Sequence, residues 1–328
     1  MGPASQLRRI AYLLERTHEP TYRVRAFRTA AATIAALPAA RLNTGTLTEL
    51  PGIGKTTAQV VGEALAGRTA SYLQRLEDAY APLVTGGAAM RAALRGDLHT
   101  HSDWSDGGSA IDEMADAAAE LGHDYAALTD HSPRLTVANG LSPDRLRAQL
   151  AVVANVNARL APFRLLTGIE VDILDDGQLD QDPELLARLD VVVASVHSKL
   201  RMDGPAMTRR LVTAISNPHV DVLGHCTGRL VTGRGRPESS FDSELVFTAC
   251  ARFGVAVEIN SRPERLDPPR RLLRQAIEAG CHFTIDTDAH APGQLEWQPY
   301  GCARAEECGV PADAVINTWP LADLLEWT

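Results

Sequence analysis

The stretch Leu94-Arg95-Gly96-Asp97-Leu98-His99-Thr100-His101 is a short run typical of a buried β-strand, and it leads into two histidines one residue apart. Similar runs recur along the rest of the chain, at 125–128, 163–170, 191–195, 220–224, 255–259 and 282–285. Stretches with helical periodicity lie between them, near 109–121, 142–160, 182–189, 205–217, 238–253 and 269–279. This alternation predicts an α/β fold, an irregular seven-stranded parallel β/α barrel. An open doubly wound sheet is the alternative, because strand order cannot be read from a sequence.

Side chains that commonly ligate metals follow six of these seven runs. Six of the ten histidines belong to the set, which comprises His99, His101, Asp106, His131, Glu170, His197, His225, Asp288 and His290. Because the carboxyl ends of parallel strands meet on one face of a barrel, we expect all nine to converge there. One ion cannot use nine nitrogen and oxygen ligands, so the pattern predicts two to three divalent cations. Zn²⁺ and Mn²⁺ are favoured, and Fe²⁺ is the alternative.

A centre of this kind is typical of enzymes that hydrolyse phosphoesters. Divalent cations can hold phosphoryl oxygens, activate a water molecule and neutralise charge on the leaving oxygen. The other substrate oxygens need cationic donors, and the candidates are Arg134, Arg229 and Arg262, which follow the second, fifth and sixth strands. We therefore expect Glu170, Arg229 and Arg262 to act in catalysis. Each arginine could equally be a surface ion-pair partner.

The first 95 residues differ from the rest of the chain in charge. They carry 12 Lys and Arg against 6 Asp and Glu, a balance of +6, whereas the remainder carries 20 against 35, a balance of −15. A basic segment favours binding to a polyanion, and an acidic one favours binding to cations. Undirected drift of surface charge between domains is the alternative explanation.

The basic segment predicts a group of helices joined by a tight turn. Apolar periodicity predicts one helix with Ser5 as its N-cap, ending near 17–20, and a second over 24–34 that ends at Leu37-Pro38. The string Leu50-Pro51-Gly52-Ile53-Gly54-Lys55 then precedes a third periodic stretch. Its two glycines allow a tight turn that directs N–H groups toward an anion, and Lys55 adds positive charge. A turn that merely connects two helices is the alternative.

Residues from about 7 to 76 resemble the N-terminal helix-hairpin-helix domain of family X DNA polymerases, through this string and the run Tyr22-Arg23-Val24-Arg25-Ala26-Phe27-Arg28. The resemblance implies binding to the DNA sugar-phosphate backbone without reading of sequence. The residues implied as DNA contacts are Gly52, Gly54, Lys55, Arg23, Arg25 and Arg28.

The strings that carry the nine candidate ligands resemble the PHP (polymerase and histidinol phosphatase) family. They include Asp97-Leu98-His99-Thr100-His101-Ser102, Thr129-Asp130-His131-Ser132, Ser195-Val196-His197-Ser198 and Thr287-Asp288-Ala289-His290. The resemblance implies one metal held by His99, His101, Glu170 and Asp288, and a second held by Glu170, His197 and His225. A third would be held by Asp106, His131 and His290. Glu170 would bridge the first two.

The expected organisation is a helix-hairpin-helix domain over 1–80, a Gly- and Ala-rich linker over 81–94 and a PHP domain over 95–328. The short linker leaves no room for the catalytic region of a family X polymerase. The five cysteines form no C-x-x-C pair, which predicts a reducing cytoplasm and argues against a disulfide framework. Apolar runs fall short of the ~18 residues that a membrane span needs. We expect a monomer that does not bind membranes.

Four functions fit these features to different degrees. The favoured hypothesis is a metal-dependent DNA 3′-5′ exonuclease or 3′-end-processing nuclease, because a DNA-backbone module is fused to a phosphoesterase. The first alternative is a phosphomonoesterase that acts on a small metabolite, like the histidinol phosphatases of the same family. An amidohydrolase often bridges its metals with a modified lysine, but the bridging position here is Glu170, and Lys199 lies beyond His197. A non-catalytic DNA-binding scaffold is the last alternative.

Overall fold

The computed structural model describes residues 1–38, 42 and 45–328, and these divide into two units. Unit 1 comprises Met1–Leu83 and Ala291–Gln294, and unit 2 comprises Val84–His290 and Leu295–Thr328.

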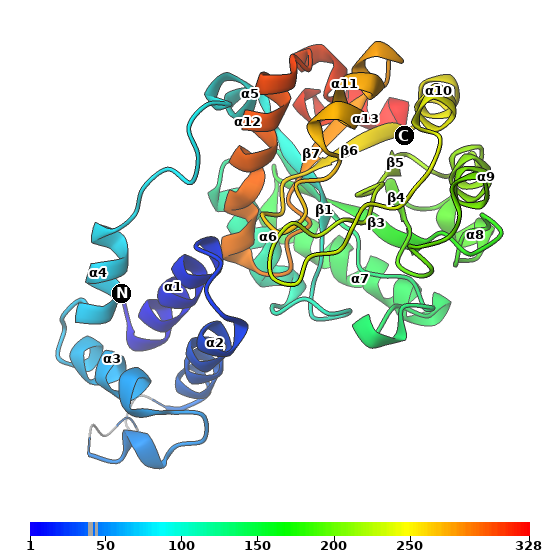
Figure 1. Cartoon of the computed structure of the whole chain (residues 1–328). Helices are drawn as coiled ribbons and strands as arrows, with labels where there is room; N and C mark the ends of the chain where they lie inside the picture. Colours follow the sequence, from blue (N-terminus) through cyan, green and yellow to red (C-terminus); the bar gives the residue numbers. More distant parts are fainter. Residues whose placement is uncertain (39–41, 43–44) are drawn as a thin grey trace. The chain divides into compact units, whose positions relative to one another are not determined.

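Unit 2 is built on seven parallel strands in a nearly closed barrel (Figure 1). The strands are β1 Gly96–Thr100, β2 Tyr125–Leu128, β3 Arg164–Asp172, β4 Val191–Ser195, β5 Val222–Leu223, β6 Ala256–Asn260 and β7 Phe283–Asp286. Each pairs in parallel with the next along the chain, and a single bridge between Thr100 and Ala289 links the two outer strands. The predicted barrel is therefore confirmed, and the order β1 to β7 excludes a doubly wound sheet, in which strand order reverses.

Helices follow the strands around the barrel. They are α5 Ala88–Ala93, α6 Ile111–Glu120, α7 Pro143–Leu160, α8 Pro183–Leu186, α9 Gly204–Ile215, α10 Ser243–Phe253, α11 Arg270–Glu278, α12 Gln298–Cys308 and α13 Leu321–Trp327. Short 3₁₀ turns cover Thr136–Ala138, Pro292–Trp297, Ala312–Ala314 and Ile316–Thr318. Four of the helices begin after a side chain whose oxygen accepts a hydrogen bond from the first turn: Ser142, Asp182, Asp203 and Asp242.

The observed elements differ from the expected ones in several places. Strand β3 continues two residues past Glu170, because Asp172 still pairs with Ser195 of β4. Residues 88–93, placed in the linker by composition, form α5. Helix α12 was not predicted at all, since its buried face includes Gln298 and Arg304, and these interrupt the apolar pattern.

Unit 1 has its own apolar core, formed by α1 Pro3–Arg16, α2 Thr21–Ala35, α3 Lys55–Leu65 and α4 Ser71–Asp78, with a 3₁₀ turn at Leu47–Glu49. Helix α1 begins at Pro3, so the prediction that Ser5 is its N-cap is wrong. Proline is favoured at the first helical position because its missing N–H would be unpaired there anyway.

No helix within residues 1–38, 42 and 45–328 is both long and apolar enough to span a bilayer.

The barrel core predicts a difference between two phenylalanines of α10. Phe247 is fully buried, whereas Phe253 is 50% exposed. We expect Phe247→Ala to lower the free energy of unfolding of unit 2 by about 3–5 kcal/mol, because it leaves a cavity. Phe253→Ala, the control, should change it by less than about 1 kcal/mol. Urea unfolding followed by tryptophan fluorescence measures both, since all four tryptophans lie in unit 2. Equal losses would contradict this packing.

Candidate metal centre

One buried carboxylate, that of Glu170 on β3, lies among five histidines. Its Oε1 is 2.8 Å from His225 Nε2 and 3.1 Å from His197 Nε2. Its Oε2 is 2.9 Å from His131 Nδ1, 3.3 Å from His99 Nε2 and 3.5 Å from His101 Nε2. These histidines come from β1 and from the ends of β2, β4 and β5. The structure therefore brings together residues that lie far apart in the sequence.

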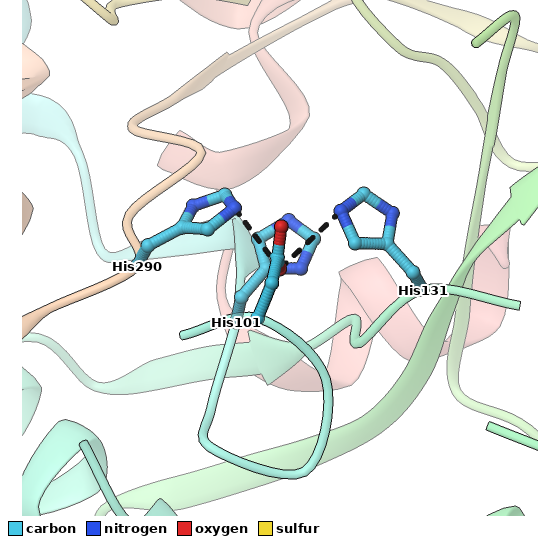
Figure 2. Close-up of side chains that lie close together, drawn as sticks. His101, His131 and His290 are labelled. Carbon is cyan, nitrogen blue, oxygen red and sulfur yellow. Dashed lines mark ion pairs between the residues drawn. The ribbon is translucent and has the colours of Figure 1, made fainter. Parts of the chain in front are cut away.

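A second group of ligating side chains adjoins the first. Asp106 Oδ1 lies 3.3 Å from His290 Nε2 and 3.5 Å from His131 Nε2, the two ion pairs drawn as dashed lines in Figure 2. Asp288 Oδ1 lies 3.5 Å from His101 Nε2. All nine predicted residues thus meet at the carboxyl ends of the strands. Their role as ligands stays a prediction.

The donor atoms in this centre fit metal ions. Three sets have their ligating atoms within 4.8 Å of one another: His101, Asp106, His131 and His290; His99, His101 and Glu170; and His131, Glu170 and His197. Several of the buried donor atoms lack a hydrogen-bond partner among the described residues, namely His99 Nε2, Glu170 Oε2, His131 Nδ1, His225 Nδ1 and both ring nitrogens of His101 and His197. Unpaired buried polar atoms are costly. Divalent cations would satisfy many of them at once.

The charges in the centre are strongly coupled. Burial raises the pKa of Glu170, but the imidazoles of His131, His197 and His99 outweigh it and hold that pKa well below its usual range. Burial lowers the pKa of His101 to about 3, helped by His290 and His131. Burial also lowers the pKa of His197, yet Glu170 and Asp172 raise it to about 9. The carboxylate is therefore anionic and His101 neutral at pH 7, the forms in which each side chain can ligate a metal.

Two further carboxylates, which the sequence analysis did not identify, orient these histidines. Glu258 on β6 is fully buried, with Oε1 2.6 Å from His99 Nδ1, while its Oε2 accepts a hydrogen bond from the backbone N–H of His225 at 2.5 Å. Asp172 Oδ1 lies 3.4 Å from His197 Nδ1 and accepts from the His197 N–H. The Glu258 contact at Nδ1 leaves Nε2 of His99 facing Glu170, and Nε2 of His197 faces Glu170 as well. A charged residue inside the apolar run 255–259 was the available signal for Glu258.

The arginines divide into two groups. Arg262 Nη1 donates to the Asp288 carbonyl oxygen at 2.8 Å and lies 2.9 Å from His290 Nδ1, so this predicted residue borders the centre. Arg265, which was not predicted, donates from Nε to Asp288 Oδ2 at 3.2 Å. Arg229 instead donates to the carbonyl oxygens of Arg265 and Leu266 and pairs with Glu238. Its guanidinium is thus engaged by the loop after β6.

The residues implied as DNA contacts form two groups, those at the turn before α3 and the three arginines of α2. In unit 1, Gly52 has φ +75°, and a Cβ there would lie 2.5 Å from Thr29 Cγ2, so the turn requires glycine. The Gly54 N–H donates to Thr57 Oγ1, and Lys55 begins α3 with its side chain exposed.

The three arginines of α2 differ in exposure and pairing. Arg25 is exposed. Arg23 pairs with Glu19 and Tyr72, and Arg28 pairs with the buried Glu15 at 2.5 Å. Arg25 and Lys55 are therefore the better placed cations for an external ligand.

Two sequence models of known families match the chain. The model described as a helix-hairpin-helix domain matches residues 3–70, and the one described as a PHP domain matches residues 97–262, half of the chain.

Individual relatives agree with these matches. The DNA polymerase/3′-5′ exonuclease PolX of Bacillus subtilis (strain 168) is 40% identical over 70% of this chain, which spans only 40% of that protein's length. A protein of Thermoanaerobacter sp. (strain X514), named a probable phosphatase, is 29% identical over 68% of this chain and 89% of its own. A crystal structure of histidinol phosphate phosphatase from Lactococcus lactis subsp. lactis Il1403 with Zn, L-histidinol and phosphate has a TM-score of 0.49 and 18% identity. It covers 66% of this chain and 94% of its own.

The contacts of Glu258 predict an effect on metal affinity. We expect Glu258→Gln to weaken binding of divalent cations by about 10–100-fold, since an amide cannot accept from both His99 and the His225 N–H. Glu278→Gln, which removes the same charge from an exposed position of α11, serves as the control. Competition with a fluorescent chelator measures both variants. Unchanged affinity in a folded Glu258→Gln protein would contradict the positioning role.

Proposed function

Because this chain belongs to the PHP domain family, we propose that it is a metal-dependent phosphoesterase that acts on DNA 3′ ends, as a 3′-5′ exonuclease or 3′-end-processing nuclease. The observation that carries the proposal is the fusion of a helix-hairpin-helix module with a centre of nine metal-ligating side chains. The first feature recognises a nucleic-acid backbone, and the second recognises a phosphoester.

The proposed cofactor is two to three divalent cations, Zn²⁺ or Mn²⁺, with Fe²⁺ as the alternative. His99, His101, Glu170 and Asp288 would hold one, Glu170, His197 and His225 a second, and Asp106, His131 and His290 a third. When bound, such ions supply Lewis acidity toward a phosphoryl group and lower the pKa of water. All nine donors come from one chain, so the proposed functional unit is a monomer. The five free cysteines are consistent with a reducing cytoplasm.

The chain's own residues would bind and orient the phosphoester. Arg262 is the proposed donor to a substrate oxygen, because it borders His290 and keeps part of its guanidinium available beyond the Asp288 contacts. Arg265 would fix Asp288 by occupying Oδ2, which leaves Oδ1 toward His101. Arg229 was also expected to donate to a substrate oxygen. Because its guanidinium is engaged by the loop after β6, Arg262 is better placed for that role. Neutral His101 and anionic Glu170 would keep the centre ready for cations at pH 7.

Unit 1 would bind the DNA backbone. Gly52 and Gly54 have no side chains, so the backbone of the turn could approach the DNA closely. Lys55 and Arg25 would contact phosphates. Such contacts depend on salt and do not read sequence. The −15 balance of the remainder would oppose binding of a long polyanion elsewhere, so the basic unit would supply most of the attraction.

A phosphomonoesterase that acts on a small metabolite is the second candidate. It is favoured by the relative named a probable phosphatase, which matches this chain over 89% of its own length. An amidohydrolase has less support, because Lys199 pairs with Asp175 and is 65% exposed, and so does not bridge the centre.

The decisive comparison offers two substrates side by side. We expect the protein to shorten a 5′-labelled DNA strand from its 3′ end with Mn²⁺ or Zn²⁺, and to act more slowly on p-nitrophenyl phosphate. Glu170→Gln should lose more than one bound ion and reduce hydrolysis by about 10²-fold or more, since one carboxylate contacts five histidines. Metal analysis and gel assays measure these effects. Much faster hydrolysis of small phosphomonoesters than of any oligonucleotide would favour the second candidate.

If unit 1 binds DNA and unit 2 carries out hydrolysis, substitutions in unit 1 should change DNA affinity alone. Arg25→Ala combined with Lys55→Ala should weaken DNA binding and reduce the slope of log affinity against log salt by about 0.7–0.9 per lost phosphate contact. Hydrolysis of p-nitrophenyl phosphate should not change. The control is Arg209→Ala combined with Arg252→Ala, two exposed arginines of unit 2. Fluorescence anisotropy measures the affinities. If both double variants behaved alike, unit 1 would not be the DNA-binding unit.

A further inference from the structure

The connection between β5 and α10 carries a small antiparallel finger, which we define as residues 230–236. Leu230 and Arg236 exchange both backbone hydrogen bonds, at 3.0 and 2.9 Å, and so close the base of the finger. Its tip is the sequence Val231-Thr232-Gly233-Arg234-Gly235. Gly233 and Gly235 have φ of +64° and +65°, so the tip needs glycine at both positions.

The base of the finger is fixed to the metal centre. It begins five residues after His225, and the Gly228 N–H donates to the His225 carbonyl oxygen at 2.8 Å. Arg236 Nε donates to the Gly228 carbonyl oxygen at 2.5 Å. The Val231 N–H donates to the carbonyl oxygen of Glu264 at 2.6 Å, and the Glu264 carboxylate lies 3.6 Å from Arg262 Nε.

Arg229 reinforces this attachment. Its guanidinium donates to the carbonyl oxygens of Arg265 and Leu266, on the loop that also carries Arg262. The finger is therefore held against the loop whose arginines contact Asp288. Arg229 connects the base of the finger to this loop, and its guanidinium is therefore not available to a substrate.

The tip, in contrast, is exposed. Val231 is 49% exposed, Thr232 to Gly235 are exposed, and a Cβ at Gly233 would meet no atom within 4 Å. Within the described part of the chain, no carboxylate pairs with the Arg234 guanidinium, although Glu238 and Glu264 near the base are both paired. The finger thus carries an unpaired cation on a rigid base beside the centre.

We propose that this finger is a second DNA contact, in which Arg234 binds a backbone phosphate of the strand whose 3′ end lies in the metal centre. The proposal rests on the proposed nuclease function and names a residue that sets its preference for a strand over a small phosphoester. Two or three extended residues beyond Val231 reach about 7–10 Å. A reach of this length exceeds the size of a single phosphoryl group, so the Arg234 guanidinium would contact a phosphate other than the one in the centre. A phosphomonoester is too small to contact both sites.

The test measures binding of a single strand to the full chain. The probe is an oligonucleotide of about 12 nucleotides with a 5′ fluorophore and nuclease-resistant phosphorothioate linkages. We expect Arg234→Ala to weaken its affinity by about threefold to tenfold and to reduce the salt slope by about 0.7. Arg234→Lys should restore most of both, because a phosphate accepts a point charge. Hydrolysis of p-nitrophenyl phosphate should remain at the wild-type rate.

Arg252→Ala is the matched control. Arg252 is exposed in the last turn of α10, four residues before β6 begins, and so lies at the end of the barrel opposite the centre. The finger proposal is overturned if Arg234→Ala and Arg252→Ala bind the strand with equal affinity and equal salt slope. It is also overturned if Arg234→Ala slows hydrolysis of p-nitrophenyl phosphate as much as it weakens DNA binding. Failure of the wild type to cut DNA would reject the nuclease function instead, because the affinity measurement does not depend on cleavage.

Discussion

The whole arrangement depends on one buried anion, the carboxylate of Glu170, which is shared by five imidazoles. A buried negative charge is stable only if positive charge or hydrogen-bond donors surround it. The barrel meets this requirement by ending four strands at histidines that point toward the same place. Glu258 and Asp172 lie on the other side of the His99 and His197 rings from Glu170. Each set of side chains in the centre therefore compensates the charge of the set that it surrounds.

The sequence predicted the barrel well because most of its strands are buried runs rich in apolar residues, and several of its helices begin at recognisable caps such as Ser142 and Asp203. It predicted the nine residues of the centre because a strand end in a parallel barrel has only one place to point. It did not identify Glu258, Asp172 or Arg265. The charge inside the apolar run 255–259 marked Glu258 as unusual, but the role of a buried polar side chain becomes clear only when its partner on another element is known. Helix α12 was missed for the same reason: Gln298 and Arg304 are buried through tertiary hydrogen bonds that no local pattern reveals.

The arginines show the limit of reasoning from position along the chain. Arg229 and Arg262 both follow strands, yet the first binds two carbonyl oxygens of a neighbouring loop and the second borders His290. In unit 1, the run that contains Arg23, Arg25 and Arg28 looks uniformly basic, but Glu15 and Glu19 neutralise two of its three charges. A cluster of like residues in a sequence therefore overstates the charge that a surface offers, because carboxylates outside the cluster neutralise part of it.

The single bridge between Thr100 and Ala289 has a consequence for how the protein is made. His99 and His290 are the first and last residues of the centre along the chain. They come together only when the segment after β7 docks beside β1, so the contacts that complete the centre link residues far apart in the sequence. Contacts of this kind form late, since the entropy of closing a long loop must be overcome first. A nascent chain emerging from the ribosome, or a fragment truncated before β7, has no complete set of donors. Loading with divalent cations would thus mark the end of folding and separate finished molecules from incomplete ones.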